Sequence, residues 1–104
     1  PSGAAQDINV VRIRAAVPGQ EVASQITASD VDLDFLLDER ARELTGEGWR
    51  WWDLARTGKL VERTRMHNPG AAPNIQDYHV VRPIPQEQID RTLGGYPQNP
   101  GYPQ

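Results

Sequence analysis

Proline recurs so often in the last third of this sequence that no long helix or strand can form there. After residue 70 it occupies six positions: Pro73, Pro83, Pro85, Pro97, Pro100 and Pro103. Each one interrupts a helix or a sheet ladder, because proline lacks a backbone N–H and its ring clashes with the preceding turn. We therefore expect residues 70–104 to be irregular, apart from one helical turn in the stretch QEQIDRT at 86–92.

Residues 1–69, in contrast, have the pattern of helices. Apolar side chains recur there at intervals of three and four residues, which predicts helices with one buried face. The expected ranges are about 4–15, 30–45, 49–57 and 59–66. The first is ambiguous, because Ile8, Val10, Val11 and Ile13 are β-branched and would also suit a strand. The expected fold class is all-α, with helical hairpins followed by the irregular Pro/Gly-rich segment.

The helix expected at 30–45 has the strongest signals. Ser29 is the expected N-cap, and Asp30, Asp32 and Asp34 place negative charge in the first turns, where the helix dipole favours it. Its apolar residues are expected to form one buried stripe, made of Leu33, Leu36, Leu37, Ala41 and Leu44.

Glycines mark the ends of the second and third helices. Gly46 is expected to take the left-handed C′ conformation after the second helix. Gly46, Glu47 and Gly48 then form a connection so short that the next helix should run roughly antiparallel. Gly58 is expected to close the third helix.

Composition excludes several kinds of site. The formal net charge of -3 leaves no basic stripe for nucleic acid, and the absence of cysteine rules out disulfides and thiolate sites. His67 and His79 are too few for a His-rich metal site. Residues 30–34 begin like a calcium loop, but Phe35 and Ala41 stand where an EF-hand needs glycine and glutamate. We predict no metal, cofactor or catalytic site.

Charged residues alternate in sign through the second helix and the corner after it. Glu39, Glu43 and Glu47 could be paired as an acid and a base, as in a glycoside hydrolase, but spacing on one helix face does not establish a cleft. With arginines interleaved among these carboxylates, a salt-bridge network is favoured over a catalytic pair.

All three tryptophans, Trp49, Trp51 and Trp52, lie within four residues of one another. On a helix Trp49 and Trp52 share a face, while Trp51 is turned away from both. We expect Trp52 and at least one other indole to pack against the stripe of the second helix. Trp49, beside the corner, is the expected exposed residue and the one candidate for ligand contact.

Three motifs in order resemble the C-terminal end of the SusD/RagB family. Glu39-Arg40 to Glu43 comes first, followed by Glu47-Gly48-x-Arg50-Trp51-x-Asp53-Leu54. The third is Arg82-Pro83-Ile84-Pro85 together with the ending Asn99-Pro100-Gly101-Tyr102. The upstream stretch INVVRIRAAVPG is also similar to a family segment with a VRxRAG-like turn, from which residues 16–19 depart slightly.

The resemblance implies a larger protein with a transport role. Members of this family are outer-membrane lipoproteins of Bacteroidetes-type bacteria, mostly α-helical, with tetratricopeptide-like helix pairs. An N-terminal lipid, absent from this chain, anchors them facing the cell surface. They cover a SusC-type TonB-dependent transporter and deliver oligosaccharides or other nutrients to it, and they bind without cleaving. On this resemblance the chain is the C-terminal fragment of a longer SusD-like protein.

The resemblance also assigns roles to residues. The family's glycan contacts belong largely to upstream regions, so no binding residue carries over, and Trp49 stays the one candidate here. The motif residues are expected to form a buried or half-buried ionic network in which losing one partner costs about 3 to 5 kcal/mol. Its members are Glu39, Arg40, Glu43, Glu47, Arg50 and Asp53. The tail is expected to wrap across the helical body, with Ile84 and Ile89 as anchors.

Two other classes of function compete with this interpretation. A stand-alone helical module could dock a protein partner through the Trp49–Trp52 region. A hydrolase that uses carboxylates such as Glu43 is a more distant third.

Overall fold

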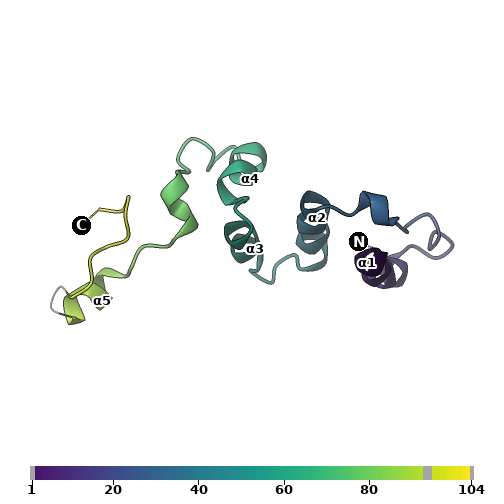
Figure 1. Ribbon diagram of the computed structural model, residues 1–104, viewed down its shortest axis with the longest axis horizontal. Coiled ribbons are helices and arrows are strands. Elements are labelled where there is room, and N and C mark those ends of the chain that lie inside the picture. Colours follow the sequence, from purple (N-terminus) through teal and green to yellow (C-terminus); the bar gives the residue numbers. More distant parts are fainter. Residues whose placement is uncertain (1, 93–94, 104) are drawn as a thin grey trace. The chain divides into compact units, whose positions relative to one another are not determined.

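The computed structural model describes residues 2–92 and 95–103, so positions 93, 94 and 104 of the expected irregular segment lie outside it. Within the described residues the regular elements are five α-helices and two short 3-10 helices, with no strand (Figure 1). They are α1 (Ser2–Ala15), η1 (Ala28–Asp30), α2 (Leu33–Glu43), α3 (Arg50–Arg56), α4 (Leu60–His67), η2 (Asp77–Val80) and α5 (Gln86–Arg91). The predicted all-α class is confirmed.

The chain divides into two compact units, residues 1–47 and residues 48–104. The first unit contains α1, η1 and α2, and the second contains α3, α4, η2 and α5. The predicted antiparallel packing of the second and third helices and their tetratricopeptide-like arrangement stay predictions.

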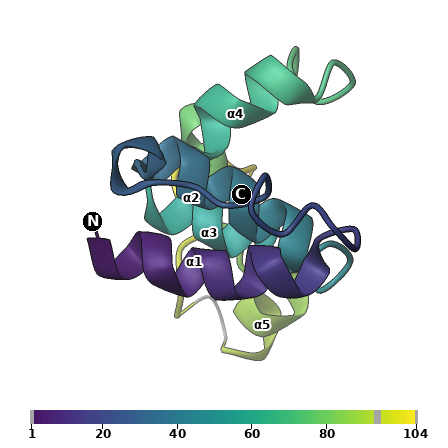
Figure 2. The ribbon, with the colours of Figure 1, turned by 90° about the vertical axis from the view of Figure 1, so that its right-hand side faces the viewer.

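Helix α1 resolves the ambiguity of the first segment in favour of a helix. It begins two residues earlier than expected and ends at Ala15 as expected. The loop after it runs back along the helix (Figure 2). Asn9 holds this loop with two hydrogen bonds, donating from Nδ2 to the carbonyl oxygen of Ile26 and accepting at Oδ1 from its N–H, both at 2.9 Å. Arg12 adds a bond from Nε to the carbonyl oxygen of Ser24 at 2.6 Å.

The start of α2 differs from the expectation. Its N-cap is Asp32, whose Oδ1 accepts from the backbone N–H of Phe35 at 2.7 Å, so the predicted N-cap Ser29 and start at residue 30 are wrong. Ser29 lies instead in η1, which Thr27 and Asp30 close with a capping box of their own. The sequence thus contains two N-caps close together, Thr27 for η1 and Asp32 for α2. The extended residue Val31 separates the two helices.

The C-terminal end of α2 and the buried stripe are partly as predicted. Gly46 has φ +85°, which confirms the left-handed conformation, although it lies two residues beyond the C-cap Leu44. Leu37 is only 1% exposed, but Leu33 and Leu36 are 44% and 37% exposed, so their predicted burial is wrong. Since α2 starts at Leu33, that side chain stands in the first turn rather than in the middle of a helix face.

In the second unit α3 and α4 form a tight helical corner. Gly58, at φ +71°, directly follows the C-cap Thr57, which confirms the predicted end of this helix. The N–H of Lys59 reaches back to the carbonyl oxygen of Leu54 at 2.8 Å. Leu54 and Leu60, on the two sides of this corner, are both buried, so the corner forms part of the core.

The C-terminal stretch contains two short elements among irregular residues. Helix α5 confirms the helical turn predicted within QEQIDRT. Element η2, which contacts α4, was not expected from the sequence. The remaining described residues of this stretch are irregular, as the spacing of the prolines predicts.

Candidate functional site: a tryptophan–arginine hollow

The tryptophans are more exposed than expected. Trp49 is 53% exposed, in line with the prediction, but Trp52 is 54% exposed, so its predicted burial is wrong. Helix α3 has only seven residues, and Asp53 and Leu54 occupy its buried side instead. Trp51 is half-buried and meets Trp52 edge to face, with ring centroids 4.8 Å apart and planes at 89°. The two indoles thus form a right-angled corner.

Arg82 occupies this corner. Its guanidinium carbon lies 4.6 Å from the ring centroid of Trp51 and 5.3 Å from that of Trp52. A guanidinium at this distance is attracted by the electron-rich ring faces, which gives a cation–π contact. Within residues 2–92 and 95–103, no carboxylate pairs with the Arg82 side chain. The site therefore carries a positive charge that its own surroundings do not neutralise.

Beside Arg82 and the two indoles lies an open hollow of about 450 Å³. Its lining is apolar apart from two arginines, and consists of Trp51, Trp52, Ala55, Arg56, Val80, Val81 and Arg82. Arg56 donates from Nε and Nη2 to Oδ1 of the buried Asp53, at 3.2 and 3.0 Å. An apolar surface with two guanidinium groups and no acid suits a ligand that combines an apolar face with negative charge.

The backbone of residues 81–84 is held by side chains that follow it in the sequence. Tyr102 donates its hydroxyl to the carbonyl oxygen of Val81, and Asn99 donates Nδ2 to that of Arg82, each at 2.7 Å. Gln98 bonds both the N–H and the carbonyl oxygen of Ile84. We call residues 98–102 the C-terminal clasp. It joins the two halves of the third sequence motif and fixes the backbone from which Arg82 extends.

The clasp turns at Gly101 against the ring of Tyr78. Gly101 has φ +92°, and a Cβ on it would lie 2.3 Å from Cγ of Tyr78. Tyr78 meets Tyr102 edge to face, with centroids 4.9 Å apart. Glycine is required here both for the left-handed backbone and for the close approach of the ring.

Two members of the predicted ionic network, Glu39 and Glu43, pair with arginines of α1 that the sequence did not suggest. Glu39 accepts from Arg12 at 2.8 Å and from Arg42 at 2.6 Å, while Glu43 pairs with Arg14. Arg12 and Arg14 lie on α1, and nothing in their spacing relative to α2 pointed to these partners.

Other members of that network are placed as follows. Asp53 is buried and pairs with Arg56, Arg50 is half-buried, and Glu47 is exposed. Arg40 lines the hollow described next. A single network linking all six residues stays a prediction.

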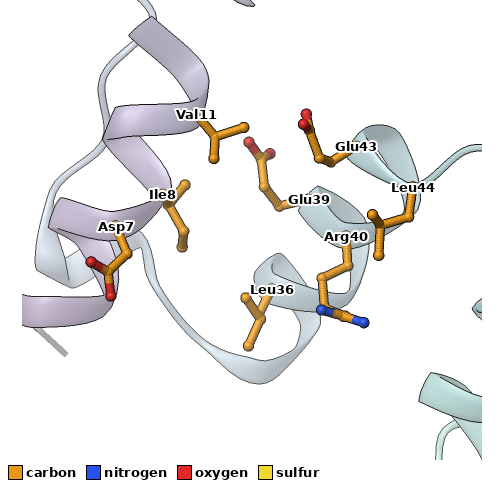
Figure 3. Close-up of a pocket in the computed structure, with 8 residues that line it drawn as sticks. All are labelled: Asp7, Ile8, Val11, Leu36, Glu39, Arg40, Glu43 and Leu44. Carbon is orange, nitrogen blue, oxygen red and sulfur yellow. The ribbon is translucent and has the colours of Figure 1, made fainter. Parts of the chain in front are cut away.

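A second hollow, of about 250 Å³, lies between α1 and α2 in the first unit. Figure 3 shows Ile8 and Val11 of α1 directed toward α2, which contributes Leu36 and Leu44. Its remaining lining residues are charged: Asp7, Glu39, Arg40 and Glu43. Two of these carboxylates already hold arginines, so this hollow is largely an apolar gap between helices.

Nothing in the described part of the chain gathers the ligands of a metal site, since no three His, Asp or Glu side chains come together. Among the described helices, none has the length and apolar character needed to cross a membrane.

Comparison with known proteins identifies the family. The sequence model of the SusD family matches residues 1–102, and the chain belongs to this family. It is 39% identical over 67 residues to SusD-like protein P38 of Formosa agariphila, covering 60% of this chain and 13% of that protein. It is 35% identical over 110 residues to SusD-like protein P25 of the same organism, covering 92% and 20%. No solved structure matches.

The match confirms the resemblance seen in the three motifs. The chain spans 20% or less of the length of these two curated relatives. Proteins of the SusD family are generally non-catalytic binding proteins at the outer-membrane surface.

Proposed function

We propose that this chain is the C-terminal part of a SusD-like lipoprotein that captures oligosaccharides or other nutrients at the cell surface. The whole protein delivers them to a SusC-type TonB-dependent outer-membrane transporter, and it cleaves nothing. The family match over residues 1–102 carries the proposal. The small share of each relative that is matched, 13% and 20%, supports the view that most of the ligand-capturing surface belongs to other residues.

Within such a protein, this part has a mainly structural role. The motif residues Glu39 and Glu43 pair with arginines of α1, and the C-terminal clasp fixes residues 81–84. We propose that the six motif residues, Glu39, Arg40, Glu43, Glu47, Arg50 and Asp53, secure the helices on which the binding surface is built.

Titration calorimetry of the whole polypeptide with a panel of oligosaccharides tests the capture step. We expect saturable binding to at least one glycan and, after prolonged incubation, a glycan of unchanged length by chromatography. Release of shortened products would instead show a hydrolase, and Glu43→Gln would then be the first variant to examine.

Isolation of the protein from outer membranes tests the transport step. We expect it to be lipid-modified and to co-purify with a TonB-dependent transporter after gentle detergent extraction. Recovery of the protein only in the cytosol, without lipid, would refute both the proposed location and the proposed partner.

The exposure of Trp49 and Trp52, 53% and 54%, favours one alternative, a helical module that docks a protein partner through Trp49–Trp52. Quenching of tryptophan fluorescence by acrylamide separates the two functions. Protection that arises only with a protein partner supports the docking module, whereas protection by glycan supports capture.

A further inference from the structure

We propose that Arg82 and the hollow beside Trp51 and Trp52 bind the carboxylate and the ring of a uronic acid residue. This inference rests on the proposed function, because it names the kind of sugar that one subsite of a glycan-binding protein would take. It places a ligand contact within this chain, at residues other than the sequence candidate Trp49.

The geometry of Arg82 leaves its hydrogen-bond donors available. A guanidinium contacts an aromatic ring through its face, while its five N–H groups point outward in the plane. The guanidinium carbon lies 4.6 Å from the Trp51 centroid and 5.3 Å from the Trp52 centroid, and no carboxylate among the described residues pairs with its N–H groups. A carboxylate fits these N–H groups with two parallel hydrogen bonds, which is the strongest arrangement that arginine offers.

The arginine is also held in place before any ligand arrives. Asn99 bonds the carbonyl oxygen of Arg82 itself, and Gln98 fixes Ile84 two residues further on. The two indoles then confine the guanidinium at the other end of the side chain. A receptor fixed at both ends loses little conformational freedom on binding, so more of the interaction energy appears as affinity.

The hollow supplies a surface for the rest of the sugar. Trp52, Val80 and Val81 are all exposed large apolar residues in its lining. The C–H groups on one face of a sugar ring pack against such a surface, as they do against an indole. A volume of about 450 Å³ is within the usual size of small-ligand sites.

Arg56 adds a further hydrogen-bond donor at the same hollow, while its charge is paired with Asp53. Its Nε and Nη2 are engaged by Asp53, which orients the side chain and leaves Nη1 as a further donor. The lining contains no carboxylate that would repel an acidic ligand. The partner that fits is therefore a ring with one carboxylate rather than a neutral sugar.

The test compares one glycan in two chemical forms. Calorimetry of the intact protein with a tetrasaccharide that contains glucuronic acid, and with its carboxyl-reduced counterpart, isolates the carboxylate. We expect the acidic form to bind about tenfold to a hundredfold more tightly, as a bidentate charged contact would give. A sulfated but carboxylate-free tetrasaccharide serves as a third ligand and should bind less tightly than the acidic form.

Substitution of Arg82 locates the effect. In Arg82→Gln the acidic and reduced forms should bind equally. Arg82→Lys keeps the charge but cannot donate two parallel hydrogen bonds, so it should retain only part of the preference for the acidic form. The matched control is Arg91→Gln, on α5 in the same unit, whose side chain pairs with Glu87 in solvent. That variant should keep the full preference, and circular dichroism should show unchanged helix content in all three.

The outcomes distinguish this inference from the proposed function. Equal binding of both forms by the wild-type protein, or a preference that survives in Arg82→Gln, refutes the subsite but leaves glycan capture intact. Equal binding of the sulfated and acidic ligands refutes the carboxylate as the group recognised. Failure to bind any of the three glycans, together with the rest of the panel, overturns the inference and the proposed function at once.

Discussion

The side-chain amide of Gln98 forms two hydrogen bonds with the backbone of Ile84, donating from Nε2 to the carbonyl oxygen at 2.8 Å and accepting at Oε1 from the N–H at 2.7 Å. This reciprocal pair makes Gln98 the central residue of the C-terminal clasp. A carboxylate in its place keeps the acceptor, loses the donor and sets a negative oxygen against a carbonyl oxygen.

We therefore expect Gln98→Glu to lower the free energy of unfolding by about 1 to 3 kcal/mol, the cost of an unsatisfied polar contact. Urea unfolding followed by tryptophan fluorescence measures the loss and also reports on the indoles beside Arg82. The control is Gln88→Glu on α5, where the side chain is exposed. Equal effects of the two substitutions would show that the clasp adds no stability.

Gly101→Ala should lower the free energy of unfolding more than the same substitution at another glycine with a left-handed backbone. A Cβ at Gly101 would lie 2.3 Å from Cγ of Tyr78, so the ring must move in addition to the backbone strain at φ +92°. At Gly58, φ is +71° and the space for a Cβ is open among the described residues. We expect a loss of about 1 to 2 kcal/mol in the free energy of unfolding for Gly58→Ala and clearly more for Gly101→Ala, by the same urea measurement.

Asp32 and Ser29 provide a direct test of where α2 begins. Asp32→Ala removes the cap on the N–H of Phe35 and should cost about 0.5 to 2 kcal/mol. Ser29→Ala leaves that cap in place and should cost a few tenths of a kcal/mol or less. Thermal unfolding of both variants measures the two losses of stability. A larger loss for Ser29→Ala would show that Ser29 is the N-cap of α2, as the sequence suggested.

Substitution of Glu39 should lower the free energy of unfolding more than substitution of a solvent-exposed glutamate in an ion pair. Its side chain is 14% exposed and accepts from both Arg12 and Arg42, so Glu39→Gln weakens two contacts at a half-buried position. We expect a loss of about 2 kcal/mol, below the cost at a fully buried pair. Glu87→Gln, at an exposed pair with Arg91, should cost less than about 0.5 kcal/mol. Similar losses of stability in Glu39→Gln and Glu87→Gln would show that the burial of Glu39 does not strengthen its ion pairs.

Asp30 should give a small dependence of stability on pH. The backbone N–H of Thr27, and then its hydroxyl, donate to the Asp30 carboxylate and hold its pKa below the ordinary value. A carboxyl with a lowered folded-state pKa stabilises the fold above its unfolded pKa, about 3.9, and loses this contribution as the pH falls through the folded value. The stability difference between the wild-type protein and Asp30→Asn should therefore shrink between pH 6 and pH 2, and a constant difference would refute it.

The features predictable from the sequence were those that depend on local rules. Periodicity predicted α4 to within one residue, and the glycine rule predicted the end of α3 at Gly58. The start of α2 was misplaced because Thr27 with Asp30 and Asp32 with Phe35 are both good capping sets, and residue types alone do not rank them.

The candidate site depends on contacts that no local pattern contains. Trp52 was expected to be buried from its spacing along the helix, yet Asp53 and Leu54 occupy the buried side of α3. Arg82 belongs to a motif far along the chain from Trp51, and only the folded backbone brings the two together. The motif Asn99-Pro100-Gly101-Tyr102 could be recognised in the sequence, but its role in holding residues 81–84 could not.

The order in which the clasp is made has a consequence for biosynthesis. Gln98, Asn99 and Tyr102 follow the residues they hold by 14, 17 and 21 positions. A ribosome releases a chain from its N-terminal side, so α3 and α4 can fold while Arg82 still lacks these partners. A released chain truncated before residue 98 would therefore carry Trp51 and Trp52 without a fixed Arg82, and a ligand that needs this arginine would report on completed synthesis.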